Sequence, residues 1–268
     1  MSDNLGSNQQ DNNADNPEWV KVEYRFYPLT EAILISVVVF FAIFITTYFI
    51  YFHTLNAQKG EIREGLLRTA SVGALFVDGD AHRQFISPDQ EKSAEYAKAI
   101  LPLKNILVAD STIAYVYTLV MKNDKVYFVL DPTLSNHKNG NGIDDKSHIM
   151  QEYREANNVV ILALKKHLRI ADQEPYQDRW GSFISAYVPV YDSDGKFACV
   201  LGVDIRADNY FKRLAPIKRA TIRAVVTGFF VSFLIGALVW FMRKFSKIMN
   251  RSRHNIYEKY IRLKSGQT

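Results

Sequence analysis

The sequence predicts an α+β domain held between two transmembrane helices, and three observations lead to this prediction. Two long stretches carry no charged residue, Ala32–Phe52 with 21 residues and Ala224–Met242 with 19. Between them, the apolar residues follow a helical period in some segments and a strand period in others. Strand hairpins interrupted by a helical segment are typical of one antiparallel sheet with helices on its faces.

The two uncharged stretches have the length of membrane spans. As helices they would be about 31 and about 28 Å long, close to the roughly 30 Å of a hydrocarbon core. Core helices of soluble proteins are usually amphipathic and shorter, and the apolar part of a secretory signal has only about 7 to 15 residues. We therefore expect transmembrane helices at 31–53 and 224–242. The leader 1–30 is mostly polar, and we expect it to be disordered.

The distribution of positive charge predicts the orientation in the membrane. The tail 243–268 carries eight Lys and Arg residues against one acid, Glu258. Such segments stay in the cytoplasm, so both termini should be cytoplasmic and residues 54–215 outside, with 216–223 as a juxtamembrane helix. The basic residues before the second span follow a long translocated domain, where this rule weakens. The formal net charge of +5 is thus a membrane-surface feature, and nucleic-acid binding is not indicated.

The outer segment begins with helices. Thr54–Leu75 should continue the first span as a stalk helix. Its apolar stripe would consist of Leu55, Ile62, Leu66, Ala70 and Val72. A turn at Asp78 and Gly79 precedes a second helix, which should begin at the N-cap Ser87 and run to about Leu107.

Two hairpins follow, separated by a long loop and a helix. The alternating strands are predicted at 112–121 with 125–130, and at 180–192 with 196–205. Between the hairpins lie a loop at 131–148 and a helix at 157–171, and residues 207–223 should form a helix that enters the second span. We expect the stalk helix on one face of the sheet and the loop with its helix on the other.

Three segments carry a resemblance to a known family: VDGDAHRQF, IAYVYTLVMKNDKVYFVLDPT and DRWGSFISAYVPVYDSDGKFACVLGVDI. Over about residues 54–210 the chain resembles the Cache family, the extracytoplasmic PAS-like sensor domains of bacterial transmembrane receptors. The resemblance implies a PAS-like antiparallel five-stranded sheet with a long N-terminal stalk helix. It also implies a ligand pocket under the loop insert, a place in the bacterial inner membrane, and a signal carried by the flanking helices.

The candidate ligand site combines aromatic rings with buried polar groups. Asp204 ends a strongly apolar strand, where a carboxylate is costly unless it is paired. The family often uses this position for a ligand's amine or hydroxyl, and the alternative is a cap for the exit helix. Asp131 either contacts ligand or makes an Asp-Pro turn. The predicted ligand-binding residues are Tyr115, Tyr117, Asp131, Trp180, Ser182, Ser185, Tyr187 and Asp204.

The alternating period assigns strand faces without saying which face holds the pocket. Tyr115 and Tyr117 should share one face of their strand. In the third strand, Trp180, Ser182 and Ile184 should share one face, and Phe183, Ser185 and Tyr187 the other.

Metal binding and catalysis are not indicated. The loop 139–145 alternates Asn and Gly but lacks the acids of a calcium loop, so a flexible turn is favoured. The six histidines show no zinc spacing, and no nucleophile motif is present. We expect no cofactor, no metal and no enzymatic activity. The single cysteine, Cys199, excludes an intrachain disulfide.

The second span carries small residues at every fourth position: Ala224, Gly228, Ser232 and Gly236. Such a stripe permits close helix approach and predicts a homodimer interface, although small residues are common in spans.

Together these features predict a membrane sensor for a small molecule of the amino acid, amine or carboxylate class. It would pass ligand occupancy to a cytoplasmic output module that is separate from the chain or has been lost. The alternative is a membrane scaffold or accessory subunit whose outer domain binds another protein.

Overall fold

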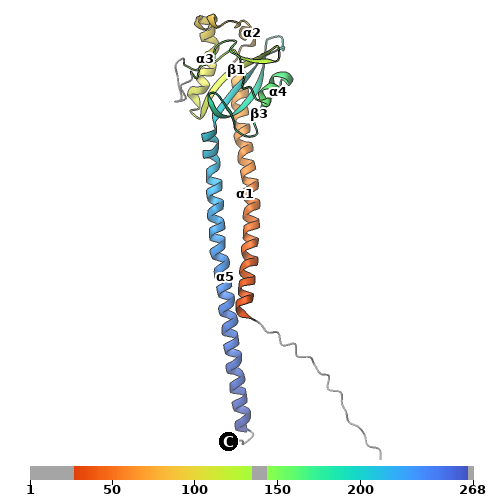
Figure 1. The fold of residues 1–268 in the computed structure, drawn as a ribbon, viewed down its shortest axis with the longest axis vertical. Helices are drawn as coiled ribbons and strands as arrows, with labels where there is room; N and C mark the ends of the chain where they lie inside the picture. Colours follow the sequence, from red (N-terminus) through yellow and green to blue (C-terminus); the bar gives the residue numbers. More distant parts are fainter. Residues whose placement is uncertain (1–26, 135–143, 265–268) are drawn as a thin grey trace, which may run out of the picture. The chain divides into compact units, whose positions relative to one another are not determined.

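The computed structural model describes residues 27–134 and 144–264 (Figure 1). The chain divides into two compact units, one of Met1–Phe41 with Phe229–Thr268 and one of Ala42–Gly228. Helix α1 (Pro28–Ala74) and helix α5 (Ala207–Lys264) contribute to both units. Among the described residues, these two helices are long and apolar enough to cross a membrane.

The small residues of the second span pack against α1 of the same chain. In the first unit, a Cβ added at Gly236 would collide with Ser36 Oγ, and Ser232 is buried. In the second unit, a Cβ at Gly228 would lie 2.6 Å from Ile43 Cγ2, whereas Ala224 is exposed. Three of the four residues are therefore buried or closely packed within one chain. A homodimer stays a prediction.

The folded domain in the second unit is built on one antiparallel sheet. Five strands follow the order β2-β1-β6-β5-β3, and the short β4 pairs with β5 beside this path. The strands are β1 (Ile113–Lys122), β2 (Lys125–Phe128), β3 (Ile170–Ala171), β4 (Tyr176–Asp178), β5 (Gly181–Tyr191) and β6 (Phe197–Arg206). The α+β class and the two long hairpins are confirmed, whereas β3 and β4 are too short to leave an alternating pattern in the sequence.

The second predicted helix is divided into two. Asp78 caps the short α2 (Gly79–His82), as the turn there predicted. The next segment is a 3₁₀ helix (Pro88–Lys92) that starts at Ser87, and α3 (Ala94–Ala109) begins anew after Ser93. Ser93 Oγ accepts a hydrogen bond from Tyr96 N, so it acts as a second N-cap inside the predicted helix.

Helix α4 (Asn158–Lys166) ends earlier than the sequence predicted. Its C-cap residue His167 has φ 53°, a left-handed conformation that ends the helix. The chain then extends, and Ile170 pairs with Tyr187 as part of β3. The segment predicted as one helix thus contains a helix and a short strand.

Helices cover both faces of the sheet, as predicted. On one face, α1 contributes Ile62, Leu66 and Ala70 to an apolar core. Val72 is 56% exposed, and the stripe continues instead at Gly73, where a Cβ would lie 2.9 Å from Leu201. On the other face, α4 contributes Val160, Ala163 and Leu164 to a second core (Figure 1).

Candidate functional site

The strand register brings the polar residues of three strands into adjacent rows. Tyr115 on β1 and Ser185 on β5 both pair with Asp204 on β6. One row further, Tyr117 and Tyr187 flank Gly202. All of these side chains lie on the α4 face, because residues two apart in a strand point to the same side. This settles which face of the sheet carries the polar groups.

Gly202 is needed for the position of Tyr117. A Cβ at residue 202 would lie 2.5 Å from Cε2 of the Tyr117 ring. The ring therefore lies directly over the glycine, and its hydroxyl donates a hydrogen bond of 3.0 Å to Asp204 Oδ1. Any larger residue would displace the phenol from the carboxyl group.

A small cavity of about 20 Å³ opens over this surface. Six aromatic residues, four aspartates and one serine form its wall. These are Tyr115, Tyr117, Phe128, Tyr153, Trp180 and Phe183, then Asp131, Asp145, Asp178 and Asp204, and Ser147. Among the described residues, no Lys, Arg or His lines it.

Asp204 is a deeply buried acid of this wall, with 3% of its surface exposed. Burial raises the pKa of its carboxyl group well above the ordinary value; the hydrogen bond from Ser185 lowers it, nearby Asp178 raises it, and the Tyr117 hydroxyl lowers it. Both of these hydrogen-bond donors are neutral hydroxyls, which compensate a buried negative charge only in part. The raised pKa means that a negative charge on Asp204 is unfavourable unless a positive partner compensates it.

Asp178 contrasts with Asp204 because backbone amides satisfy it. Its Oδ1 accepts hydrogen bonds from Trp180 N at 2.9 Å and Gly181 N at 3.2 Å, and its Oδ2 accepts one from the Tyr153 hydroxyl at 2.9 Å. These bonds hold the turn that directs the Trp180 ring to the cavity. Burial still raises the pKa of Asp178.

A chain of hydroxyl groups lies behind the cavity wall. Tyr176 on β4 contacts the hydroxyl oxygens of Tyr153, Ser185 and Tyr187 at 3.2, 3.2 and 3.4 Å. Burial raises the pKa of Tyr176, so it stays a neutral donor and acceptor. The network joins β4 and β5 to the segment before α4.

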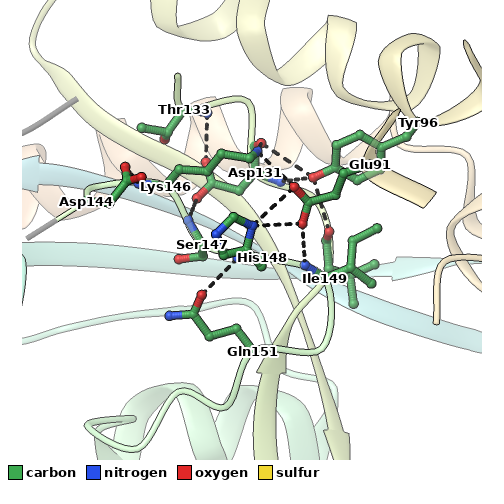
Figure 2. Close-up of polar contacts among 11 residues, drawn as sticks. Glu91, Tyr96, Asp131, Thr133, Asp144, Lys146, Ser147, His148, Ile149 and Gln151 are labelled. Carbon is green, nitrogen blue, oxygen red and sulfur yellow. Dashed lines mark hydrogen bonds and ion pairs between the residues drawn. The ribbon is translucent and has the colours of Figure 1, made fainter. Parts of the chain in front are cut away.

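Asp131 closes the long loop at the mouth of the cavity (Figure 2). Its two carboxylate oxygens accept hydrogen bonds from Thr133 N at 2.8 Å and from Ser147 N at 2.7 Å. Burial raises the pKa of Asp131, and these bonds oppose that shift. Its geometry supports the turn interpretation, with a role in shaping the wall.

A second set of contacts ties the segment 146–149 to the 3₁₀ helix (Figure 2). Glu91 accepts a hydrogen bond from Ile149 N at 2.9 Å and lies 3.2 Å from His148 Nδ1. Lys146 Nζ donates to the carbonyl oxygen of Asp131 at 2.9 Å and lies 3.9 Å from Glu91. The ammonium group of Lys146 is thus engaged outside the cavity wall.

The structure brings most of the predicted site residues together. Tyr115, Tyr117, Asp131, Trp180 and Asp204 line the cavity. Ser185 and Tyr187 lie behind it, where both are fully buried. Whether these residues bind a ligand stays a prediction.

Ser182 was predicted at the ligand site, but it does not line the cavity. It is exposed, and its hydroxyl donates to the carbonyl oxygen of Tyr176. Ser182 and Ile184 belong to the α1 face of β5, opposite to Phe183. Trp180 does not share their face, because β5 begins only at Gly181 and Trp180 stands in the turn before it.

Six further residues line the wall that the sequence did not predict: Phe128, Asp145, Ser147, Tyr153, Asp178 and Phe183. Phe183 shares a strand face with Ser185 and Tyr187, so the alternating period could have indicated it. Phe128 and Asp178 end the short strands β2 and β4, and the other three lie outside the strands, where no period predicts direction.

Metal binding has no support among residues 27–134 and 144–264, which contain no cluster of three or more metal-ligating side chains. Most of the loop 139–145, for which we expected a flexible turn, lies outside the described residues.

No family model and no curated protein matches the chain. Among solved structures, it is similar to the ligand-binding domain of the Campylobacter jejuni chemoreceptor Tlp3 in complex with L-valine, at 16% identity and a TM-score of 0.44, covering 68% of this chain and 67% of that one. The sensory domain of the same receptor with isoleucine bound is similar at 15% identity and a TM-score of 0.45, and the match covers 68% of this chain and 66% of that one.

A third similar structure is an extracellular ligand binding receptor from Desulfohalobium retbaense, at 14% identity and a TM-score of 0.38, covering 63% of this chain and 26% of that one. The chain thus spans about two thirds of the length of the chemoreceptor domains. At these identities the likeness concerns the fold, and the site has to be interpreted from its own residues.

Proposed function

We propose that this chain is a membrane-anchored receptor whose outer domain binds a small organic cation, an amine, in the cavity between the sheet and the residues Asp145, Ser147, Tyr153 and Trp180. The observation that carries the proposal is the composition of the cavity wall: six aromatic rings and four aspartates, with no basic side chain among the described lining residues.

Aromatic rings and carboxylates suit the same kind of ligand. The face of an aromatic ring attracts a cation, and a buried carboxylate needs a positive partner to hold its charge. An α-amino acid would add a carboxylate, which this wall would meet with aspartates and not with a guanidinium or ammonium group. The geometry therefore favours an amine over an amino acid or a carboxylic acid.

Asp204 is the counterion in this proposal. Burial raises the pKa of its carboxyl group, so its charged form needs a positive partner. An ammonium group placed beside it favours the charged form, so binding releases a proton and becomes tighter as pH rises toward that pKa. The other three aspartates of the wall would add to the negative potential.

The proposed signal path is short. Asp204 lies three positions before Ala207, the first residue of α5, and no loop separates β6 from this helix. A change of charge and position at Asp204 would therefore act on the start of the helix that enters the second candidate span. A ligand can shift this equilibrium only by its difference in affinity for the two arrangements.

The membrane placement rests on the two apolar helices and on the basic tail. Residues 31–53 and 224–242 would span the bacterial inner membrane, with the domain in the periplasm or outside the cell and both termini in the cytoplasm. A cytoplasmic output partner follows from this arrangement as part of the proposal.

Three matched compounds test the ligand class on the full chain in detergent. Isobutylamine is L-valine without its carboxylate, and 3-methylbutanoate is L-valine without its ammonium group. We expect isobutylamine to raise the melting temperature most, L-valine less, and 3-methylbutanoate not at all. Titration calorimetry in buffers with different ionisation enthalpies should show proton release with the amine.

The outcomes separate the alternatives. Tighter binding of L-valine or of 3-methylbutanoate would contradict the amine class and keep a small-molecule sensor. If a broad panel of metabolites gave no shift and a stable protein complex formed on the outer domain, the scaffold or accessory subunit would be the correct function.

A further inference from the structure

The end of α5 is a helix with a strong excess of positive charge. Past the apolar stretch that ends at Met242, the helix continues unbroken to Lys264. The segment 243–264 has eight Lys and Arg residues and one acid, Glu258, which pairs with His254 at 3.2 Å. This part of the chain would attract a negatively charged partner.

The same segment carries an exposed apolar stripe. Met242, Met249, Ile256 and Leu263 recur at intervals of seven, which places them on one side of the helix. Phe245 and Tyr260 lie on the same side. We name Phe245, Met249, Ile256, Tyr260 and Leu263 the tail seam. Their exposed fractions are 54, 45, 66, 60 and 76%.

A second copy of the chain fits this seam poorly. With Met249 and Ile256 at the first heptad position, the fourth positions are Ser252 and Lys259. In a parallel pair of identical helices, Lys259 would face Lys259 of the other copy in the seam. Like charges brought out of water at such a position are unfavourable.

A lipid surface fits less well than a helix. An amphipathic helix lies in the plane of the interface, so a helix that leaves a span must first bend. Sharp bends occur mostly at Pro or Gly, and α5 has neither between Ala237 and Lys264. An unbroken helix carries its seam away from the bilayer.

We propose that the tail seam is a docking surface for an acidic amphipathic helix of a second protein. Apolar residues of the partner would fill the seam. Its Asp and Glu side chains would lie along Arg253 and Lys259 and neutralise charge that opposes self-pairing. This inference rests on the proposed receptor function and names the chemistry of the output partner.

The test uses the full chain in nanodiscs of zwitterionic lipid and a labelled four-heptad peptide with Ile and Leu in its seam and Glu on both flanks. A second peptide has the same seam with Lys on both flanks. Fluorescence anisotropy should show the Glu peptide binding at least about tenfold more tightly than the Lys peptide.

Two variants at similarly exposed positions distinguish contacts in the tail seam from the effect of net charge. Ile256→Glu places a charge in the seam, whereas Tyr257→Glu places the same charge on the next residue, 63% exposed and off the stripe. We expect Ile256→Glu to weaken binding at least about tenfold and Tyr257→Glu by less than about threefold. Equal losses in the two variants would overturn the proposal, because attraction by charge alone would explain them.

Two further results would also overturn it. Cys199 is buried, so an Ile256→Cys variant has one accessible thiol, and its disulfide cross-linking in nanodiscs with two copies would make a second copy the occupant. Displacement of the Glu peptide by nanodiscs rich in phosphatidylglycerol would make lipid the occupant. The isobutylamine shift, measured on the same samples, reports on the ligand site alone, so failure at the tail is distinct from failure of the proposed function.

Discussion

The two faces of the sheet are built from the same three strands and differ in chemistry. On the α1 face, β5 and β6 present Ile184, Ala186, Leu201 and Val203, all fully buried and apolar. On the α4 face, the intervening residues include Tyr115, Tyr117, Ser185 and Asp204. One face therefore serves stability, and the other holds groups whose burial is unfavourable without a partner.

This difference indicates which face of the sheet would bind a ligand. A polar group buried at a cost in stability is kept when a function needs it, whereas an apolar core needs no such explanation. Thr118 and His82 on the α1 side are a contrasting case. The Thr118 hydroxyl lies 2.8 Å from His82 Nε2 and accepts from Leu130 N, and burial lowers the pKa of His82 to about 4. That pair is neutral and satisfied without a ligand.

The largest expected effect comes from the apolar face. Leu201→Ala removes a fully buried side chain that packs against Gly73 of α1, and we expect the free energy of unfolding to fall by about 2 to 5 kcal/mol. Denaturant titration of the full chain in detergent measures this loss. Amine affinity of the folded fraction should stay unchanged, and a parallel loss of affinity would show that the two faces are not separate.

The converse change is Asp204→Asn on the polar face. It removes the proposed counterion but replaces a buried carboxyl group, whose charged form is unfavourable there, with a neutral amide, so the melting temperature should stay the same or rise. Isobutylamine affinity should fall by about 100-fold or more, equivalent to about 2.7 kcal/mol. Asp194→Asn is the matched control, because it removes one charge from a side chain that is 70% exposed. Full affinity in Asp204→Asn would contradict the counterion role.

The sequence predicted which residues share a face of the sheet only within segments where apolar and polar residues alternate. Alternation placed Tyr115 with Tyr117 and Ser185 with Tyr187, and both pairs lie where expected. It failed at Trp180, because the period does not continue before Gly181, whose φ of 146° breaks the strand. The alternating period also could not predict which face carries the cavity, since that depends on where α1 and α4 pack.

The rest of the site comes from segments without a period. Tyr153 precedes α4 and Asp178 ends a strand of three residues, so only tertiary contacts bring them to the cavity. The helix ends show the same limit. Ser93 and His167 each interrupt a predicted helix through local hydrogen bonding or backbone conformation that apolar spacing does not reveal.

The polar face should also make stability depend on pH. Asp172, at the end of β3, accepts hydrogen bonds from Ser185 N and Asn157 Nδ2, and burial raises its pKa to about 7. The unfolded chain loses this proton at its ordinary, lower pKa, so the folded state loses stability as pH rises from about 4 through about 7.

Asp172→Asn should remove its share of this dependence, about 2 kcal/mol between about pH 5 and pH 8. Denaturant titrations at the two pH values measure it. The loss caused by Leu201→Ala should be equal at both pH values, because no titrating group is involved. An unchanged pH slope in Asp172→Asn would mean that the carboxyl group does not titrate in this range.

The smallest expected effect comes from Tyr117→Phe, which keeps the ring over Gly202 and deletes only the hydroxyl that donates to Asp204. The charged form of Asp204 loses one of its two hydroxyl donors, so amine affinity should fall by about five- to tenfold, or about 1 kcal/mol. The pKa of Asp204 should rise further, which shifts the pH at which affinity levels off to a higher value. Titration calorimetry across pH measures both effects, with Tyr191→Phe, a half-exposed tyrosine on the hairpin, as the control. If affinity fell with no shift of the pH profile, Tyr117 would contact the ligand directly and Asp204 would not be the titrating group.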